Sequence, residues 1–227
     1  MIEPEMIVIP SGVIRMGCER GAENERPVHR VSLDQFAIGR FAVTNREYRN
    51  FVKATANSAP KNWTDVRFNH PDKPVVGVSW FDATKYCEWL SQKSNKLYRL
   101  PTEAEWERAA RGLLEDKLYT WGDEAPNLQP NYDLLWIDGP ERVGQRPQNT
   151  FGLFEISENI HEWCSDWFDK DYYSGSPFHN PKGPIAGTRR SSRGGSWRHK
   201  IRIARVSARS SLPPDFRYDD YGFRCAI

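Results

Sequence analysis

Cysteine is scarce in this 227-residue chain. The four cysteines are scattered, and no two of them form a Cys-x-x-Cys pair. That spacing signals neither a zinc site nor a thioredoxin-like redox motif. In a reducing compartment the expected state of such cysteines is the buried thiol.

Long hydrophobic runs are also missing. Hydrophobic residues make up 38% of the chain and the mean hydropathy is −0.73. No stretch approaches the ~20 apolar residues that a membrane-spanning helix needs. The first residues, Met-Ile-Glu-Pro-Glu, show no basic region followed by an apolar one, as a secretory signal would. We therefore expect a cytoplasmic protein without a membrane partner.

The net charge is small, at +2, but it is unevenly distributed. Residues 189–227 carry ten Arg and Lys against three Asp, which leaves 22 basic and 27 acidic side chains in the first 188 residues. Two interpretations stay open: a guanidinium-lined face that holds an anionic ligand or a partner, or arginines that pair inward with an acidic scaffold. Nucleic acid is not expected, because Ser, Pro and Asp interrupt the basic residues and no nucleic-acid motif is present.

Aromatic residues, glycine and proline are abundant, with nine Trp, nine Tyr, eleven Phe, 16 Gly and 16 Pro. Each aromatic side chain buries a large area, which compensates for the low hydropathy. The glycines and prolines favour turns and ordered loops over a helical bundle. Since no linker-like segment divides the chain, the composition predicts one loop-rich α+β domain over residues 1–227.

Local patterns predict individual elements. Two apolar runs around Pro10-Ser11-Gly12 predict a hairpin over residues 6–17, and alternating apolar residues predict a further strand over 27–38. Helix starts are expected at Thr44, Ser79 and Thr102, each followed three residues later by an acidic residue. The second of these helices should bury Cys87.

Three glutamates, Glu103, Glu105 and Glu107, follow the last of these starts. Helix capping and a solvated helix face explain them without a catalytic role.

Hard oxygen donors occur in the loop-rich second half, and calcium prefers such ligands. Their alternative role is Asx-turn chemistry at loop corners. They include Asn131, Asp133, Asp138, Asn159 and Glu162. His161, between the last two, is interpreted as a surface or wedge residue rather than a general base.

Nine short motifs, in the order in which they follow along the chain, resemble the formylglycine-generating enzyme, or sulfatase-modifying factor, family. They span nearly the whole chain and include Arg99-Leu-Pro-Thr-Glu-Ala-Glu-Trp-Glu107, Asn159-Ile-His-Glu-Trp163, Arg193-Gly-Gly-Ser-Trp197 and Gly222-Phe-Arg224. The resemblance implies a loop-rich α+β fold of the C-type-lectin-like kind with little regular secondary structure. It also implies that Cys87 and Cys225, which match a family cysteine pair, are neighbours in space.

The resemblance further implies structural calcium. The family's calcium-binding Asn-x-x-Glu segment corresponds to Asn159, Ile160, His161 and Glu162, and a second family site is partly matched by Asn131, Tyr132 and Asp138. Glu158 replaces the usual glycine before Asn159.

The family's copper chemistry is a different matter, because it depends on two cysteines just after the Gly-Gly-Ser turn, and soft thiolates suit copper(I). In this chain those positions are His199 and Ala204, and no cysteine lies between Cys164 and Cys225. Ser196 matches a family active-site serine. We therefore do not expect copper-dependent oxidation of cysteine to formylglycine.

Iron is not expected either. The related sulfoxide synthases need an additional helical domain with a His-rich iron site, and this chain has no His-x-x-x-His motif. Iron would require the scattered histidines His29, His161 and His199 to converge.

Two functions remain open. One is an oxidoreductase or maturation factor that acts on a peptide or thiol substrate near Ser196, His199, Arg205 and Arg209. The other is a non-catalytic module that binds a peptide, small-molecule or protein ligand on the face formed by residues 189–221.

Overall fold

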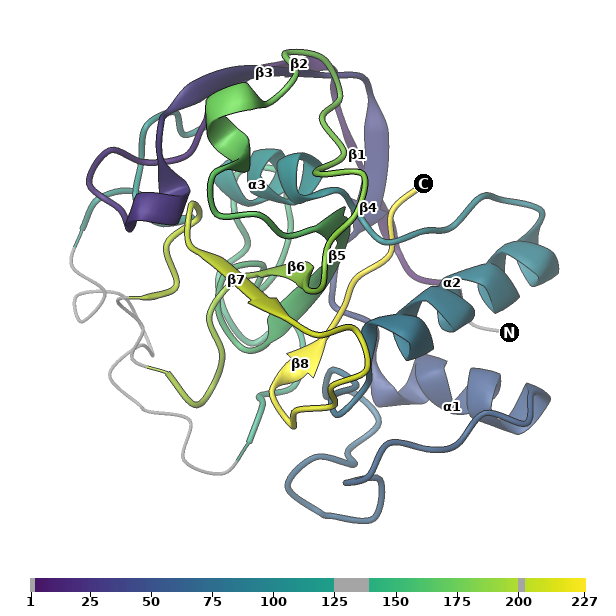
Figure 1. Cartoon of the computed structure of the whole chain (residues 1–227). Coiled ribbons are helices and arrows are strands. Elements are labelled where there is room, and N and C mark those ends of the chain that lie inside the picture. Colours follow the sequence, from purple (N-terminus) through teal and green to yellow (C-terminus); the bar gives the residue numbers. More distant parts are fainter. Residues whose placement is uncertain (1–2, 125–138, 200–202) are drawn as a thin grey trace.

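The computed structural model describes residues 3–124, 139–199 and 203–227 (Figure 1). Its helices are α1 (Asn45–Ala54), α2 (Trp80–Ser94) and α3 (Glu103–Arg111), with two short 3₁₀ helices, η1 (Glu23–Glu25) and η3 (Tyr172–Gly175). Its strands are β1 (Met6–Ile9), β2 (Gly12–Met16), β3 (His29–Leu33), β4 (Phe36–Gly39), β5 (His161–Trp167), β6 (Arg190–Arg193), β7 (Arg209–Leu212) and β8 (Tyr221–Gly222). The short elements and long connections confirm the predicted loop-rich α+β architecture.

The first four strands form one interrupted antiparallel ribbon rather than the predicted hairpin. β1 pairs with β4, and β2 pairs with β3. The register carries across the break, because Ile9 lies opposite Phe36 and Gly12 lies opposite Leu33. Pro10 lies in this break and has no N–H to donate to a ladder. The hairpin prediction is therefore wrong, since the two apolar runs continue each other, and the single strand predicted over 27–38 is two strands.

All three helix starts are confirmed. Thr44, Ser79 and Thr102 each accept a hydrogen bond from the backbone N–H three residues later, and the acidic residue at that position binds back to the cap. This reciprocal pairing satisfies two N–H groups that the first helical turn leaves free. Local sequence was therefore sufficient to place these helices.

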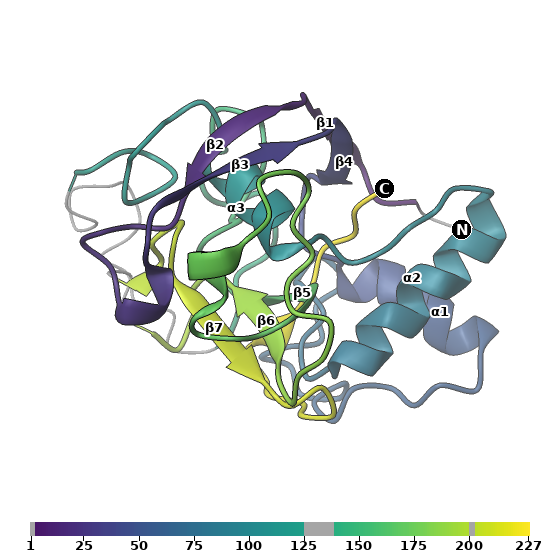
Figure 2. The ribbon, with the colours of Figure 1, turned by 45° about the horizontal axis from the view of Figure 1, so that its top comes forward.

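The C-terminal half builds a four-stranded sheet in the order β7-β6-β5-β8. β5 pairs antiparallel with β6 and parallel with β8. Helix α3 contacts both this sheet and the β2–β3 ribbon, while α1 and α2 lie beside each other on another side of the molecule (Figure 2).

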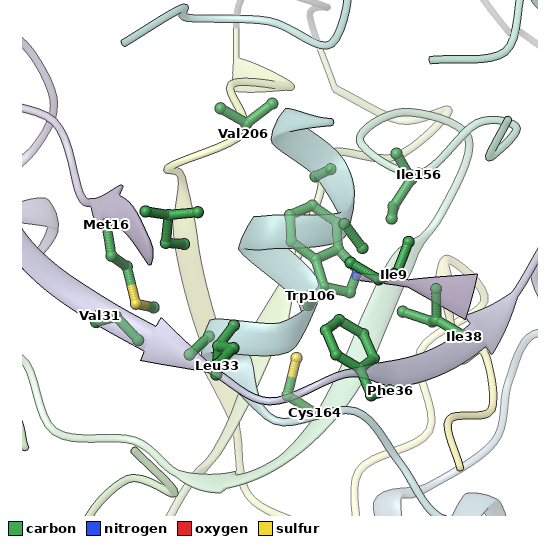
Figure 3. Packing of buried hydrophobic residues seen from close by; sticks show 14 of the residues in the cluster. Ile9, Met16, Val31, Leu33, Phe36, Ile38, Trp106, Ile156, Cys164 and Val206 are labelled. Carbon is green, nitrogen blue, oxygen red and sulfur yellow. The ribbon is translucent and has the colours of Figure 1, made fainter. Parts of the chain in front are cut away.

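Trp106 of α3 is the centre of the core between the ribbon and the sheet (Figure 3). Its indole is fully buried, and its Nε1 donates to Glu162 of β5 at 2.7 Å. Apolar side chains from the ribbon and from β5 surround it, among them Ile9, Phe36, Ile38 and Cys164. A second core, around Tyr48, Tyr86 and Phe223, holds α1 and α2 against the C-terminal chain.

Candidate functional site

A tight turn follows β6 at Gly194-Gly195. Gly194 has a φ of +81°, and a Cβ there would lie 3.3 Å from the carbonyl oxygen of Ile160. Only glycine adopts this conformation without a steric cost. The N–H of Gly195 donates to the Ser157 carbonyl and that of Trp197 to the Asn159 carbonyl, both at 2.8 Å. These bonds hold the turn against the chain that leads into β5.

The sheet brings a third segment to the same place. His161 is the first residue of β5 and lies opposite Tyr221, the first residue of β8. Its N–H donates to the carbonyl of Asp220 at 2.9 Å. The entry to β5, the turn after β6 and the entry to β8 therefore meet at one end of the sheet.

Four side chains converge there: Ser196, His161, His199 and Asp220, which we call the Ser–His–His–Asp cluster. The Ser196 hydroxyl donates to Asp220 Oδ2 at 2.9 Å and lies 3.3 Å from His199 Nδ1. His161 Nε2 lies 3.2 Å from His199 Nδ1. Ser196, His161 and Asp220 are buried and His199 is half-buried, so the cluster opens toward His199.

Burial keeps His161 neutral. Loss of solvent lowers the pKa of the His161 imidazole to about 4, the charge of Asp220 opposes this shift, and His199 adds to it. The ring also packs at 4.7 Å from the ring of Tyr221. The prediction that His161 is a surface or wedge residue is therefore wrong, because β5 carries it into the sheet.

The cluster is not arranged as a serine-hydrolase triad. In such a triad histidine lies between serine and the carboxylate. Here Asp220 accepts directly from Ser196, while His199 contacts Ser196 and His161. In this cluster two imidazole nitrogens, a carboxylate oxygen and a hydroxyl face one another. Such groups can share a proton or bind a metal ion.

Arg205 and Arg209, the other predicted pocket residues, are engaged elsewhere. Arg205 forms an ion pair with Glu25. Arg209 binds both carboxylate oxygens of Glu103, at 2.7 and 3.0 Å. These contacts tie the chain after the cluster to η1 and α3. Both arginines thus pair inward with acidic residues, which is one of the two interpretations of the uneven charge. A role for them in catalysis stays a prediction.

The glutamates of α3 are not on a solvated face. Glu103, Glu105 and Glu107 are buried. Burial opposes ionisation of Glu103, but the guanidinium groups of Arg209 and Arg193 lower its pKa to about 2. The expectation of a solvated face is wrong, because arginines of the C-terminal sheet pair with Glu103 and Glu107. Glu105 caps the helix as predicted and pairs with Arg99.

The predicted calcium ligands are already used in part. Arg224 binds both carboxylate oxygens of Glu162 at 2.7 Å, and Trp106 binds one of them. The Asn159 amide bridges to the backbone of Glu141, and Ile160 is buried. Calcium at this segment would have to compete with the Arg224 guanidinium for its one carboxylate, that of Glu162. Asn131, Tyr132 and Asp138 lie outside the described residues, and calcium binding stays a prediction.

His29 does not join the cluster, since its ring packs 4.5 Å from that of Tyr173. Sequence reasoning missed Asp220. The only signal was its place directly before the closing Tyr221-Gly222-Phe223-Arg224 motif, and its relation to His161 depends on the β5–β8 pairing.

Cys87 and Cys225 are neighbours, as predicted. Their Sγ atoms lie 3.9 Å apart in the core, and both are free thiols. The hydrogen bond with Cys87, and then burial, raise the pKa of the Cys225 thiol. The raised pKa disfavours the Cys225 thiolate, which is the form that binds copper(I).

The sequence matches the model of the sulfatase-modifying factor enzyme 1-like domain over residues 2–227. It is 36% identical to the formylglycine-generating enzyme of Streptomyces coelicolor, over 96% of this chain and 87% of that one. It is 30% identical to the inactive C-alpha-formylglycine-generating enzyme 2 of Mus musculus, over 99% of this chain and 86% of that one.

Among solved structures, PvdO from Pseudomonas aeruginosa superposes with a TM-score of 0.87 at 27% identity, over 98% of this chain and 94% of that chain. This similarity confirms the fold that the motifs implied. Among the described helices, none has the length and apolar character of a membrane span.

Proposed function

The chain belongs to the sulfatase-modifying factor enzyme 1-like domain family, and from this premise we propose that it is an oxidoreductase or maturation factor that acts on a peptide or thiol substrate at the Ser–His–His–Asp cluster. The observation that carries the proposal is the position of Ser196, which matches the family's active-site serine and is hydrogen-bonded to Asp220 and adjacent to His199. A buried serine with this environment has a fixed hydroxyl that can orient a substrate.

The proposed chemistry differs from formylglycine formation. His199 and Ala204 occupy the positions of the copper-binding cysteines. Imidazole and carboxylate are harder ligands than thiolate and do not favour a linear copper(I) centre. With copper(I) and a cysteine peptide, the protein is expected to form no aldehyde.

A thiol panel tests the proposal. Oxygen uptake is measured with cysteine, glutathione and a cysteine-containing peptide, with dioxygen as the electron acceptor. We expect uptake with at least one thiol, and we expect Ser196→Ala to lower it by about 10²-fold, a loss typical of removing a positioned catalytic hydrogen bond. Ser174→Ala is the matched control, because Ser174 is exposed. The absence of uptake with every thiol, or equal uptake by Ser196→Ala, would contradict the proposal.

A second candidate is a binding module. Phe216 and Tyr218 are 44% and 45% exposed, and their rings stack at 5.9 Å on the face formed by residues 189–221. Exposed aromatic pairs of this kind favour recognition of a ligand or partner. The similarity to a mouse relative named inactive agrees with this function. Peptide binding that survives Ser196→Ala but is lost in the Phe216→Ser, Tyr218→Ser double variant would favour it.

A further inference from the structure

The nitrogen atoms of His161 and His199 face each other at a distance that suits a shared ion. His161 Nε2 and His199 Nδ1 are 3.2 Å apart. One ligand atom from each of His161, His199 and Asp220 also lies within 4.8 Å of the other two. Ligand nitrogens bound tetrahedrally at 2.0–2.1 Å from a metal lie roughly 3.3 Å apart. The histidine pair already has this spacing.

Ser196 completes a four-atom shell. Its Oγ lies 3.3 Å from His199 Nδ1 and 2.9 Å from Asp220 Oδ2. The donor atoms come from three segments that the sheet and the glycine turn hold together, so the shell is built into the backbone. Ligands fixed in this way lose little freedom when an ion binds.

We propose that His161, His199 and Asp220 bind one divalent first-row transition metal ion, with the Ser196 hydroxyl at the edge of its coordination shell. Two imidazoles and one carboxylate form the facial donor set of non-haem iron(II) oxygenases, and similar sets also hold zinc. Calcium and magnesium are disfavoured, because they prefer shells made only of oxygen. Iron was not expected from the sequence, but two of the three histidines named for it do converge.

The surroundings support this assignment. Arg198 binds Asp219 at 2.6 Å and lies 3.5 Å from Asp220 Oδ1, which orients the carboxylate while Oδ2 faces Ser196. Partners of this kind orient ligands in metal sites.

The proposed metal ion would be the cofactor of the proposed function at the same site. Its role in the reaction therefore rests on that function. Iron(II) bound there would supply oxygen activation, with the Ser196 hydroxyl positioning the substrate beside it. Metal binding is measured without substrate, so the two proposals fail separately. A metal that binds without thiol turnover would overturn the proposed function alone, and turnover that a chelator leaves intact would overturn this inference alone.

The test uses the whole chain, stripped of metal with a chelator and titrated anaerobically with cobalt(II) as a coloured probe, then with iron(II) and zinc(II) by calorimetry. We expect one ion per chain, visible ligand-field absorption with cobalt, and no displacement by a large excess of calcium or magnesium. His199→Ala should weaken binding by more than the roughly 10- to 100-fold that loss of a ligand's supporting partner costs. His179→Ala is the control, because that histidine is 59% exposed and lies near Asp34.

Thermal melting shows whether a variant has lost the metal site alone or has failed to fold. The ion should raise the melting temperature of the wild type and of His179→Ala, but not that of a folded His199→Ala variant. Asp220→Asn, which keeps the size of the side chain, is a second variant and should also weaken binding. Stoichiometric binding that is unchanged in His199→Ala and Asp220→Asn, or no stoichiometric binding to the wild type, would overturn the inference.

Discussion

Two buried glutamates and two buried arginines lock α3 to the C-terminal sheet. Arg193 is fully buried and binds Glu103 at 2.9 Å, and it also pairs with Glu107. Arg209 also binds Glu103, at 2.7 Å. A buried ion network of this kind contributes little net stability compared with an apolar core, but removing one member leaves an uncompensated charge. Its role here is to fix the path of β6 and β7, which carry the chain past the cluster.

Replacing Glu103 by Gln should therefore strongly destabilise the folded protein. Arg193 and Arg209 would lose their shared counter-charge, and we expect the free energy of unfolding to fall by about 3–5 kcal/mol. Urea denaturation measures this change. Glu115→Gln is the matched control, because Glu115 is exposed, and it should change stability by less than ~0.5 kcal/mol. A Glu103→Gln variant as stable as this control would contradict the description of the network.

Asp166 makes the free energy of unfolding depend on pH. Burial, and then the charge of Glu103, raise the pKa of its carboxyl from 3.8 to about 7. The folded state thus holds a proton between about pH 4 and pH 7 that the unfolded state has released. Stability from this group is fully present below about pH 4 and is lost progressively as the pH rises from about 4 to about 7. Glu103 does not titrate in this window, because its pKa lies near 2.

The variant Asp166→Asn should not lose stability in this way as the pH rises, because its side chain does not titrate. In the wild type, Asp166 Oδ2 accepts hydrogen bonds from the Glu103 N–H at 2.9 Å and from the Ser165 hydroxyl at 3.0 Å. The amide oxygen of asparagine can still accept both. We expect the variant to gain stability relative to the wild type between roughly pH 5 and pH 8, by on the order of 2–3 kcal/mol. Urea curves at both pH values measure the difference. A difference between variant and wild type that is the same at both pH values would show that Asp166 does not titrate there.

At the scale of elements, the glycine turn after β6 determines whether the cluster assembles. Gly194 is held at positive φ against the Ile160 carbonyl, in the segment just before β5. An alanine there would adopt a left-handed conformation at a cost of roughly 1–2 kcal/mol and would push Ser196 away from Asp220.

Gly194→Ala is therefore expected to lower both thermal stability and cobalt(II) affinity, measured by melting and by titration. Gly175→Ala is the control, because a Cβ at Gly175 has no neighbour within 4 Å. If Gly194→Ala bound cobalt(II) as tightly as Gly175→Ala, the turn would not position the cluster.

Elements defined by local sequence were predictable, and those defined by distant pairing were not. Thr44, Ser79 and Thr102 mark helix starts because the cap and its partner lie within one turn. The Pro10-Ser11 break looked like a hairpin because nothing local distinguishes a turn from an interruption in a longer ribbon. The pairing of β1 with β4 is set by residues far along the chain.

At the scale of the whole molecule, the same limit applies to the site. The motifs identified the family and pointed to Ser196 and His199, which are three residues apart. Asp220 was missed and His161 misplaced because both enter the cluster only through the β5–β8 pairing. The inward pairing of the arginines was one of two open alternatives, and choosing between them required the contacts of Glu25 and Glu103.

In the proposed site, nitrogen and oxygen donors take the place of the sulfur ligands that the family resemblance implies. The serine and the glycine turn are present as Ser196 and Gly194-Gly195, while His199 and Ala204 stand at the two positions where the resemblance implies cysteine. Such a replacement alters which metal the site accepts while leaving the scaffold in place.

X-ray absorption at the iron, zinc and copper edges, on tag-free protein purified without added metal, tests this claim most directly. The protein should hold about one iron or zinc ion per chain, bound by nitrogen and oxygen atoms, and this ion should be lost in His199→Ala. Copper(I) with two sulfur neighbours, or a metal shell unchanged in His199→Ala, would contradict it.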